Sequence, residues 1–518
     1  MNKERLLIRI EGVVQGVGFR PFIYRLAEES NLKGYVRNTS KGVEIEVEGD
    51  RNKVDKFPSI IKKKAPPLAR INRISTQNIS FKGDSAFNIK NSNNTSNTIA
   101  MIPPDISICN DCVNDITTPD NRRYQYPFTN CTNCGPRFSI IKNLPYDRSQ
   151  TTMKSFEMCK KCKKEYNNSL NRRYHAQPNA CPECGPHIWL LKNSGDKYST
   201  SGPIKTTIRL LKQGKIIAVK GLGGFHLMCD AKNKKVVTKL RKRKKRPEKP
   251  LALMMDDIST VGRYCYISEK EEDILKGKRK PILLLDKKRK KELAGNIAPG
   301  SKYYGIMLPY TPLHYLLLND NLKVIVATSG NISGNPIEFK NESAYKSLRN
   351  VADYFLMHNR EIYLPVDDSV VRVIMDKERL LRRARGYVPY PVKVKGLQTG
   401  LALGAEQKNT NTSSKENYAF LSQHLGKLRN KSVYDNFKIM IKHFNKLYNL
   451  KPDFIAHDLH PDYQSTHHVN KMIYVSNSKD IKQNLIKHSN ILQYQRDPKI
   501  AIIGLQHLAH LTRIRSEK

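Results

Sequence analysis

The sequence lacks any apolar run of the roughly 18 residues that a membrane-spanning helix needs. Its first 20 residues also lack the continuous apolar core of a secretory signal peptide. Disulfide frameworks belong mainly to short secreted chains, so both absences argue against such a framework for the ten cysteines of this 518-residue chain. We therefore predict a cytoplasmic protein without a membrane segment.

Acidic residues are also scarce, because 47 Asp and Glu stand against 91 Lys and Arg, which gives a formal net charge of +44 at pH 7. Such a charge indicates affinity for phosphates, on a nucleotide or on a nucleic acid. The densest basic run covers residues 241–246, but lysine-rich runs also occur at 62–64 and 287–291. Since basic charge without a base-reading motif is a weak signal, we do not expect a nucleic-acid partner.

Eight cysteines form two quartets with the same spacing, C-x2-C-x18-C-x2-C, and each member is offset by 50 residues from its counterpart. The members are Cys109, Cys112, Cys131 and Cys134 in the first copy and Cys159, Cys162, Cys181 and Cys184 in the second. Two C-x2-C turns supply four thiolates to one tetrahedral ion and leave no open position. The repeat predicts two structural zinc ions and a zinc-finger unit over residues 99–195.

One histidine in the repeat and two cysteines outside it are not expected to bind zinc. His175 occupies the position of Gln125 in the first copy, which argues against its being a zinc ligand. Cys229 and Cys265 lie outside the pattern and are expected to be ordinary buried thiols.

The first 91 residues show alternating periodicities, and a polar stretch at residues 91–97 ends this unit. The pattern predicts strands over residues 6–10, 35–37, 43–47 and 71–79 and helices over residues 20–30 and 54–63. This β-α-β-β-α-β order is typical of the ferredoxin-like fold.

A glycine-rich loop, residues 12–20, separates the first predicted strand from the first predicted helix. Its glycines allow backbone N–H groups to converge on an anion at the helix N-terminus, and Arg20 can clamp a phosphate, although a simple tight turn would also use glycines. The sequences Val-Gln-Gly-Val-Gly-Phe-Arg at 14–20 and Gly-Tyr-Val-Arg-Asn at 34–38 resemble acylphosphatase. By that resemblance Arg20 binds the phosphoryl group and Asn38 orients the attacking water as the catalytic residues.

Residues 203–391 combine an apolar strand that runs into a glycine turn at 218–224 with a polar, glycine-spaced segment at 328–334. With residues 367–372 and 382–387 these segments resemble the YrdC-type adenylate-forming domain, an α/β fold that binds ATP with magnesium. Any single lysine in so basic a chain can equally be solvated surface. The resemblance implies that the nucleotide or a carbamoyl-adenylate contacts Lys220, Lys244, Arg246, Lys249, Thr328, Ser329, Gly330, Asn331, Ser333 and Arg385.

An acylphosphatase-like unit, a doubled four-cysteine repeat and a YrdC-like unit in this order resemble the HypF family of [NiFe]-hydrogenase maturation carbamoyltransferases. Residues 398–518 resemble the start of the family's actin-like transferase domain. The family's metal-binding His-His-x-Ala-His is altered here to Gln-His-Leu-Ala-His at 506–510, so His507 and His510 are candidate ligands of a further metal. The chain stops early relative to the family, and we expect a partial, truncated transferase domain.

The resemblance thus implies a multidomain α+β and α/β protein: an acylphosphatase-like domain (1–91), a tandem zinc-finger domain (99–195), a YrdC-like domain (203–391) and a partial actin-like domain (398–518). It also implies an enzyme that converts carbamoyl phosphate and ATP to carbamoyl-adenylate and transfers the carbamoyl group to the C-terminal cysteine of the partner HypE. The alternatives are an RNA-binding or tRNA-modification protein with zinc fingers, and an inactive fragment of the family.

Overall fold

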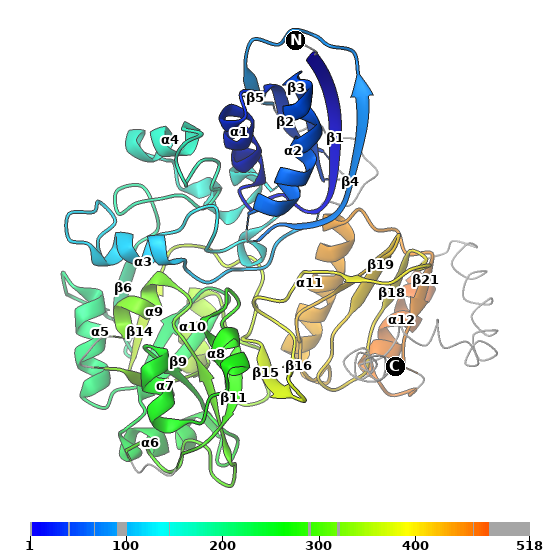
Figure 1. Ribbon diagram of the computed structural model, residues 1–518. Helices are drawn as coiled ribbons and strands as arrows, with labels where there is room; N and C mark the ends of the chain where they lie inside the picture. Colours follow the sequence, from blue (N-terminus) through cyan, green and yellow to red (C-terminus); the bar gives the residue numbers. More distant parts are fainter. Residues whose placement is uncertain are drawn as a thin grey trace.

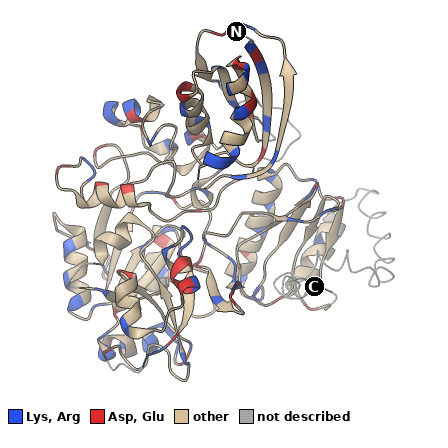
Figure 2. Ribbon diagram, viewed as in Figure 1, with Lys and Arg blue, Asp and Glu red and all other residues tan. Residues whose placement is uncertain are grey.

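The computed structural model describes residues 3–39, 42–66, 68–90, 101–144, 146–288, 292–318, 322–458 and 460–475. The chain folds into four units, and the finger unit lies between the N-terminal unit and the large third unit (Figure 1). Lys and Arg occur on elements of every unit rather than on one face alone (Figure 2). Within the described ranges, no helix combines the length and apolarity that crossing a membrane requires.

The N-terminal unit is a five-stranded sheet in the order β4-β1-β3-β2-β5, covered by two helices. Its elements are β1 (Lys3–Val13), α1 (Phe19–Glu29), β2 (Lys33–Thr39), β3 (Gly42–Asp50), α2 (Arg51–Lys64), β4 (Arg70–Ile79) and β5 (Phe87–Ile89). Apolar residues of α1 and α2, such as Ile23 and Phe57, pack with Ile8 of β1 in one core. The predicted ferredoxin-like order is confirmed, and β5 adds a strand parallel to β2.

The finger unit has little regular structure beyond α3 (Asn110–Thr117) and α4 (Lys160–Asn167), each of which begins directly after the first cysteine of its quartet. The two copies contact each other through matched arginines. Arg123 donates from Nε to the carbonyl of Ala180 at 2.9 Å, and Arg173 donates from Nε to the carbonyl of Asn130 at 3.1 Å.

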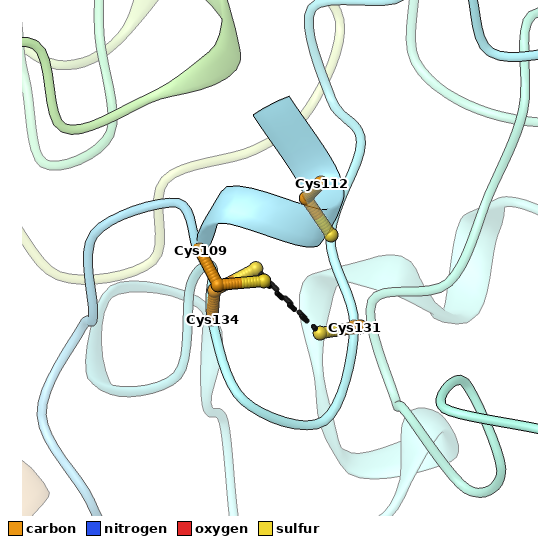
Figure 3. A group of neighbouring side chains, drawn as sticks. All are labelled: Cys109, Cys112, Cys131 and Cys134. Carbon is orange, nitrogen blue, oxygen red and sulfur yellow. Dashed lines mark hydrogen bonds between the residues drawn. The ribbon is translucent and has the colours of Figure 1, made fainter. Parts of the chain in front are cut away.

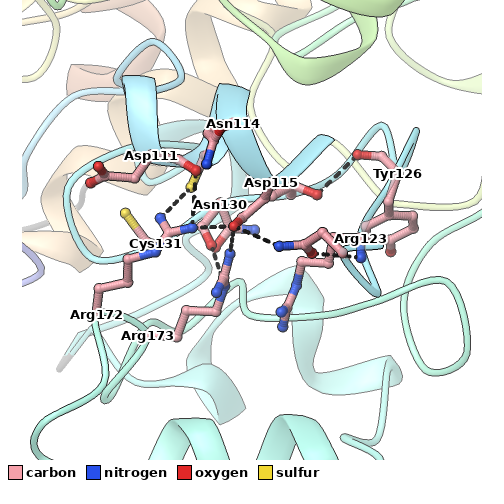
Figure 4. Close-up of polar contacts among 12 residues, drawn as sticks. Asp111, Asn114, Asp115, Arg123, Tyr126, Asn130, Cys131, Arg172 and Arg173 are labelled. Atoms are coloured by element: carbon pink, nitrogen blue, oxygen red, sulfur yellow. Dashed lines mark hydrogen bonds and ion pairs between the residues drawn. The ribbon is translucent and has the colours of Figure 1, made fainter. Parts of the chain in front are cut away.

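The carboxylates that pair with these arginines are also exchanged between the copies. Glu165 of the second copy pairs with Arg123. Asp115 of the first copy pairs with Arg172 and Arg173 (Figure 4). Burial by itself would raise the pKa of Glu165, but the hydrogen bond and charge of Arg123 outweigh it and lower the pKa to about 2. The two copies therefore form one pseudo-symmetric unit.

The third unit is built on an eleven-stranded mixed sheet in the order β16-β15-β11-β12-β10-β13-β9-β8-β14-β6-β7. The strands are β6 (Ile188–Lys192), β7 (Lys197–Tyr198), β8 (Ile217–Lys220), β9 (Phe225–Asp230), β10 (Ala252–Met255), β11 (Ile282–Asp286), β12 (Tyr303–Met307), β13 (Val324–Ser329), β14 (Tyr354–His358), β15 (Val370–Ile374) and β16 (Lys377–Arg382). The helices are α5 (Pro203–Lys212), α6 (Lys234–Lys244), α7 (Ile258–Tyr264), α8 (Glu269–Lys276), α9 (Pro312–Leu317) and α10 (Asn341–Leu348). Strands such as β8 and β9 are almost continuously buried, which explains their unbroken apolar sequences.

This sheet extends across the boundary predicted between the second and third units. β6 directly follows the last finger and pairs with β14, so residues 188–192 add a strand to the sheet of the third unit, while Ile188 also packs against the finger core. The short β6 gives no periodic signal that could assign it to a distant strand.

The C-terminal unit contains a five-stranded sheet in the order β17-β20-β19-β18-β21. Its elements are β17 (Val392–Lys393), β18 (Gly400–Ala402), β19 (Thr412–Lys415), β20 (Tyr418–Leu421), α11 (Lys431–Leu447), β21 (Phe454–Ala456) and α12 (Gln464–Val475). Phe444 of α11 packs edge-on against Phe138 of the finger unit, with ring centroids 6.1 Å apart. The described units thus share cores as well as surfaces.

Candidate functional sites

The glycine-rich loop forms the first candidate site, between β1 and α1. Gly16 and Gly18 adopt left-handed φ values of +66° and +72°, which side chains rarely tolerate. The Gln15 amide fixes the loop to the neighbouring strands by donating to the carbonyls of Thr39 and Gly42 at 2.7 and 2.9 Å. No backbone N–H of residues 15–18 donates to another described residue, so these groups are available to an anion.

The predicted catalytic residues Arg20 and Asn38 meet at this loop. Arg20 lies in the first turn of α1, and the Asn38 amide on β2, oriented with its oxygen toward the guanidinium, accepts from Nε and Nη2 at 3.2 Å each. Burial lowers the pKa of Arg20, and the charge of Asp147 acts in the opposite direction. Arg20 forms no ion pair with any described carboxylate and is thus a half-buried cation available to a phosphate.

A cavity opens at this loop, and the finger unit forms its other wall. Arg20 and Asn38 line one side, and residues 131–132 of the first copy and 174–178 of the second line the other. Arg137 ties the two sides together, because it donates to the carbonyl of Gly16 at 3.3 Å and to that of Thr132 at 2.7 Å. The sequence did not indicate that the fingers border this site.

Each cysteine quartet gathers into a group that can hold one metal ion, with the four sulfur atoms within 4.8 Å of one another. In the first group Sγ of Cys131 lies 3.7 Å from that of Cys109 and 3.9 Å from that of Cys134 (Figure 3). In the second group, Sγ of Cys181 lies 3.8 Å from the sulfurs of both Cys159 and Cys184. Four thiolates about 2.3 Å from one tetrahedral ion stand about 3.8 Å apart, so both groups fit such an ion.

An arginine from each copy reaches a cysteine of the other copy. Arg122 donates to Sγ of Cys162 at 3.2 Å, and Arg172 donates to Sγ of Cys112 at 3.0 Å. Each pair matches the other after the offset of 50 residues. Such contacts to a ligand sulfur stabilise the thiolate form and orient the ligand.

The second candidate site lies where β8 and β13 end and where β9, between them, begins. Lys220 closes β8 opposite Phe225 of β9, and Ser329 closes β13 opposite His226. Gly330 follows immediately, and a Cβ atom there would lie 2.6 Å from Cβ of Phe225, so only glycine fits. The predicted contact residues within 328–334 therefore lie at the same end of the strands as Lys220.

Lys244, at the end of α6, holds the loop of residues 329–331 in place through hydrogen bonds. Its ammonium donates to the carbonyls of Ser329 and Asn331 at 2.5 and 2.7 Å and to Oδ1 of Asn331 at 2.7 Å. Ser333 donates back to the carbonyl of Lys244 at 3.1 Å. Burial lowers the pKa of Lys244 to about 7, and the three hydrogen bonds of its Nζ go to protein acceptors.

Three other predicted nucleotide contacts occupy different surroundings. Arg246 and the exposed Lys249 lie on the loop after α6, where Arg246 donates to the carbonyl of Pro250 at 2.9 Å. Arg385 is fully buried, and its guanidinium donates to Asp368, Arg279 and Lys280. In this structure Arg385 orients Asp368, and its direct contact with a nucleotide stays a prediction.

Two buried polar groups near the second site were not singled out from the sequence. Asp368 joins Arg385 to Nε2 of His226, at 2.7 and 2.9 Å, and the charge of Arg385 with the His226 bond holds the Asp368 pKa well below its usual range despite burial. Arg360 is buried without a described partner for its Nε, and burial lowers its pKa to about 10. His507 and His510 lie outside the described residues.

Family models cover most of the chain. The acylphosphatase family matches residues 6–89, the HypF finger matches 108–141 and 158–191, the telomere recombination family (Sua5, YciO and YrdC) matches 209–384, and the HypF Kae1-like domain matches 395–514.

Individual relatives agree with these matches. The carbamoyltransferase HypF of Synechocystis sp. is 47% identical over 461 residues, which cover 88% of this chain and 60% of the relative. The carbamoyltransferase HypF2 of Cupriavidus necator is 43% identical over 486 residues, or 90% of this chain and 60% of the relative. A crystal structure of full-length HypF in a phosphate- and nucleotide-bound form is 43% identical with a TM-score of 0.87, covering 90% of this chain and 62% of that one.

The chain therefore spans about 60% of the length of the curated relatives that it matches. Its four units match, in chain order, the acylphosphatase, HypF finger, telomere recombination and HypF Kae1-like models. On this agreement of sequence, fold and paired cysteine groups, the chain belongs to the HypF family.

Proposed function

We propose that this chain carries out the first steps of carbamoyl transfer in [NiFe]-hydrogenase maturation. Carbamoyl phosphate is hydrolysed at the acylphosphatase-like loop to carbamate and inorganic phosphate. At the second site the carbamate oxygen attacks the α-phosphorus of ATP, which forms carbamoyl-adenylate and releases pyrophosphate. A carbamoyltransferase domain then moves the carbamoyl group to the thiolate of the C-terminal cysteine of HypE and releases AMP.

The observation that carries the first step is the pairing of Arg20 with Asn38 beside a loop of available N–H groups. Cleavage of an acyl phosphate needs charge stabilisation and a placed water more than a strong nucleophile. Arg20 supplies the positive charge for the phosphoryl oxygens, and Asn38 fixes the guanidinium and orients the attacking water.

The second step is supported by the strand ends that carry Lys220, on β8, and Ser329 with Asn331, at the end of β13 on the other side of β9. Attack at the α-phosphate builds negative charge that fixed cations and a magnesium ion stabilise. Lys244 holds the loop of residues 329–331 in position, and Lys220, whose pKa burial lowers to about 8, provides a cation at the end of β8.

The two cysteine groups are proposed to hold structural zinc, because four thiolates close the coordination of each ion. The ions fold a segment with little regular structure and small cores, and they take no part in the reaction. They fix the finger unit between the two reactive sites in a cytoplasmic protein.

A pyrophosphate-release assay tests the proposal. Wild-type protein is expected to cleave ATP to AMP and pyrophosphate only when carbamoyl phosphate is present. Arg20→Ala should abolish phosphate release from carbamoyl phosphate, by at least about 100-fold, with unchanged zinc content. Pyrophosphate release that does not depend on carbamoyl phosphate would sink the proposal.

A further inference from the structure

The second finger copy presents a histidine to the acyl-phosphate cavity. His175 lines the same cavity as Arg20 and Asn38, and the charge of Arg20 acts on its imidazole. The rings of Tyr166 and Tyr174 hold the imidazole in place, with centroids 5.0 and 4.4 Å away. Neither ring nitrogen hydrogen-bonds to another described residue.

The finger wall that carries His175 is tightly fixed to the loop. A Cβ atom at Gly18 would lie 3.0 Å from Thr132, and one at Gly16 would lie 3.1 Å from the ring of Tyr146. Arg25 of α1 also donates to the carbonyl of Ser169 in the second copy at 3.4 Å. The position of His175 relative to Arg20 is therefore built into the packing of the two units.

The duplication shows that the finger fold does not require this imidazole. His175 and its counterpart Gln125 share the left-handed conformation, with φ of +51° and +55°. Their N–H groups also donate to equivalent carbonyls, of Tyr166 at 3.0 Å and of Ile116 at 2.9 Å. Gln125 is exposed, whereas His175 faces the cavity. The copies therefore differ at the position that lines the cavity in the second copy.

The His175 imidazole can act as an uncharged group that both donates and accepts a hydrogen bond. Burial first, and the charge of Arg20 second, lower the His175 pKa to about 4, so the ring is neutral at pH 7. A neutral imidazole offers one N–H donor and one lone-pair acceptor. The amino group of carbamoyl phosphate needs an acceptor, and the methyl group of acetyl phosphate offers no donor.

We propose that His175 recognises the amino group of carbamoyl phosphate and so selects this substrate over acyl phosphates that lack it. The inference rests on the proposed function, because it assigns a specificity residue to the same site. Arg20 and the loop bind the phosphoryl group common to all acyl phosphates, and His175 reads the part that differs. The fingers then contribute to substrate choice as well as to structure.

The test compares phosphate release from carbamoyl phosphate and from acetyl phosphate in the full chain. His175→Gln installs the residue that the first copy carries in the same backbone conformation, so the finger should keep its fold. We expect kcat/KM for carbamoyl phosphate to fall about tenfold, mainly through KM, while that for acetyl phosphate changes less than twofold. Gln125→His is the matched control and should leave both rates and the zinc content unchanged.

His175→Ala provides a second variant, and it should lose the same preference. An unchanged ratio of the two kcat/KM values in both variants would overturn the inference, and so would an equal fall for both substrates with loss of zinc. Phosphate release that survives in Arg20→Ala would instead overturn the proposed function, which keeps the two failures distinct.

Discussion

Gly330 shows how a single residue fixes the second site. Its N–H donates to the carbonyl of Phe225 at 2.6 Å, and an added Cβ would meet Cβ and the carbonyl oxygen of that residue at 2.6 and 2.7 Å. The carbonyl oxygen belongs to the backbone and Cβ is bonded directly to it, so neither atom can rotate away. We expect Gly330→Ala to lower the free energy of unfolding by about 1–3 kcal/mol and to reduce pyrophosphate release, because Ser329 and Asn331 would shift.

Gly262, in α7, is the matched control for this substitution. Apart from its chain neighbours and the backbone of its own helix, no atom lies within 4 Å of a Cβ built at Gly262, so Gly262→Ala should be neutral or stabilise by up to about 1 kcal/mol. Denaturant unfolding of both variants measures the difference. Equal stability of Gly330→Ala and wild type would contradict the close packing described here.

At the residue scale, site residues could be predicted from the sequence where they belong to a recognisable local motif. The cysteine spacing predicted both four-sulfur groups, and the loop sequence placed Arg20 near Asn38, although 18 residues separate them. His226 and Asp368 lie 142 residues apart in the chain, and no spacing rule links the two residues. Their contact depends on the strand order of the large sheet, which the local sequence does not determine.

At the scale of elements, the finger copies stabilise each other's metal groups. Since Arg122 contacts Cys162 and Arg172 contacts Cys112, removal of either arginine should weaken the group of the opposite copy. We expect Arg122→Ala to speed chelator-driven loss of one metal equivalent, from Cys159, Cys162, Cys181 and Cys184, by about tenfold. Arg172→Ala should have the same effect on the group of Cys109, Cys112, Cys131 and Cys134.

Two double variants identify which cysteine group releases its metal. Arg122→Ala combined with Cys109→Ser retains only the second group and should release its single equivalent fast, whereas Arg172→Ala combined with Cys109→Ser should release it at the rate of Cys109→Ser alone. Faster release from the group of the same copy would show that the exchange contacts do not act on the thiolates.

Element prediction succeeded where periodicity is strong. The helices and strands of residues 3–79 follow the predicted order, and apolar residues of α1, α2, β1, β2 and β3 are buried together in one core. β5 and β6 were not predicted, since three- and five-residue strands carry little periodic signal and gain their stability from distant partners, β2 and β14. The same limit applies to β17, which joins the C-terminal sheet by pairing with β20.

At the scale of the whole molecule, the first finger copy touches both candidate sites. Thr132 lines the acyl-phosphate cavity, and Phe128, four positions earlier, packs edge-on against His358 at 5.1 Å. His358 in turn contacts the carbonyl of Gly221, in the glycine turn of the second site, and accepts a bond from Lys220 at its own carbonyl. The guanidinium of Arg360 stacks over Phe128 at 5.1 Å. The finger unit thus joins the two sites through packed side chains.

Carbamate decomposes in water, so a finger unit that joins the two sites favours passage of carbamate from one to the other inside a single molecule.

Two single-site variants test that idea: Arg20→Ala, which should make no carbamate, and Asn331→Ala, which should not form the adenylate. Asn331→Ala should still release phosphate from carbamoyl phosphate, and Arg20→Ala should bind ATP as wild type does, which shows that each untouched site is intact. An equimolar mixture should then release no more pyrophosphate in the presence of carbamoyl phosphate and ATP than the two variants do separately. Recovery of a quarter or so of the wild-type rate would mean that carbamate diffuses freely between molecules, because adenylation in one chain would then use carbamate made in another.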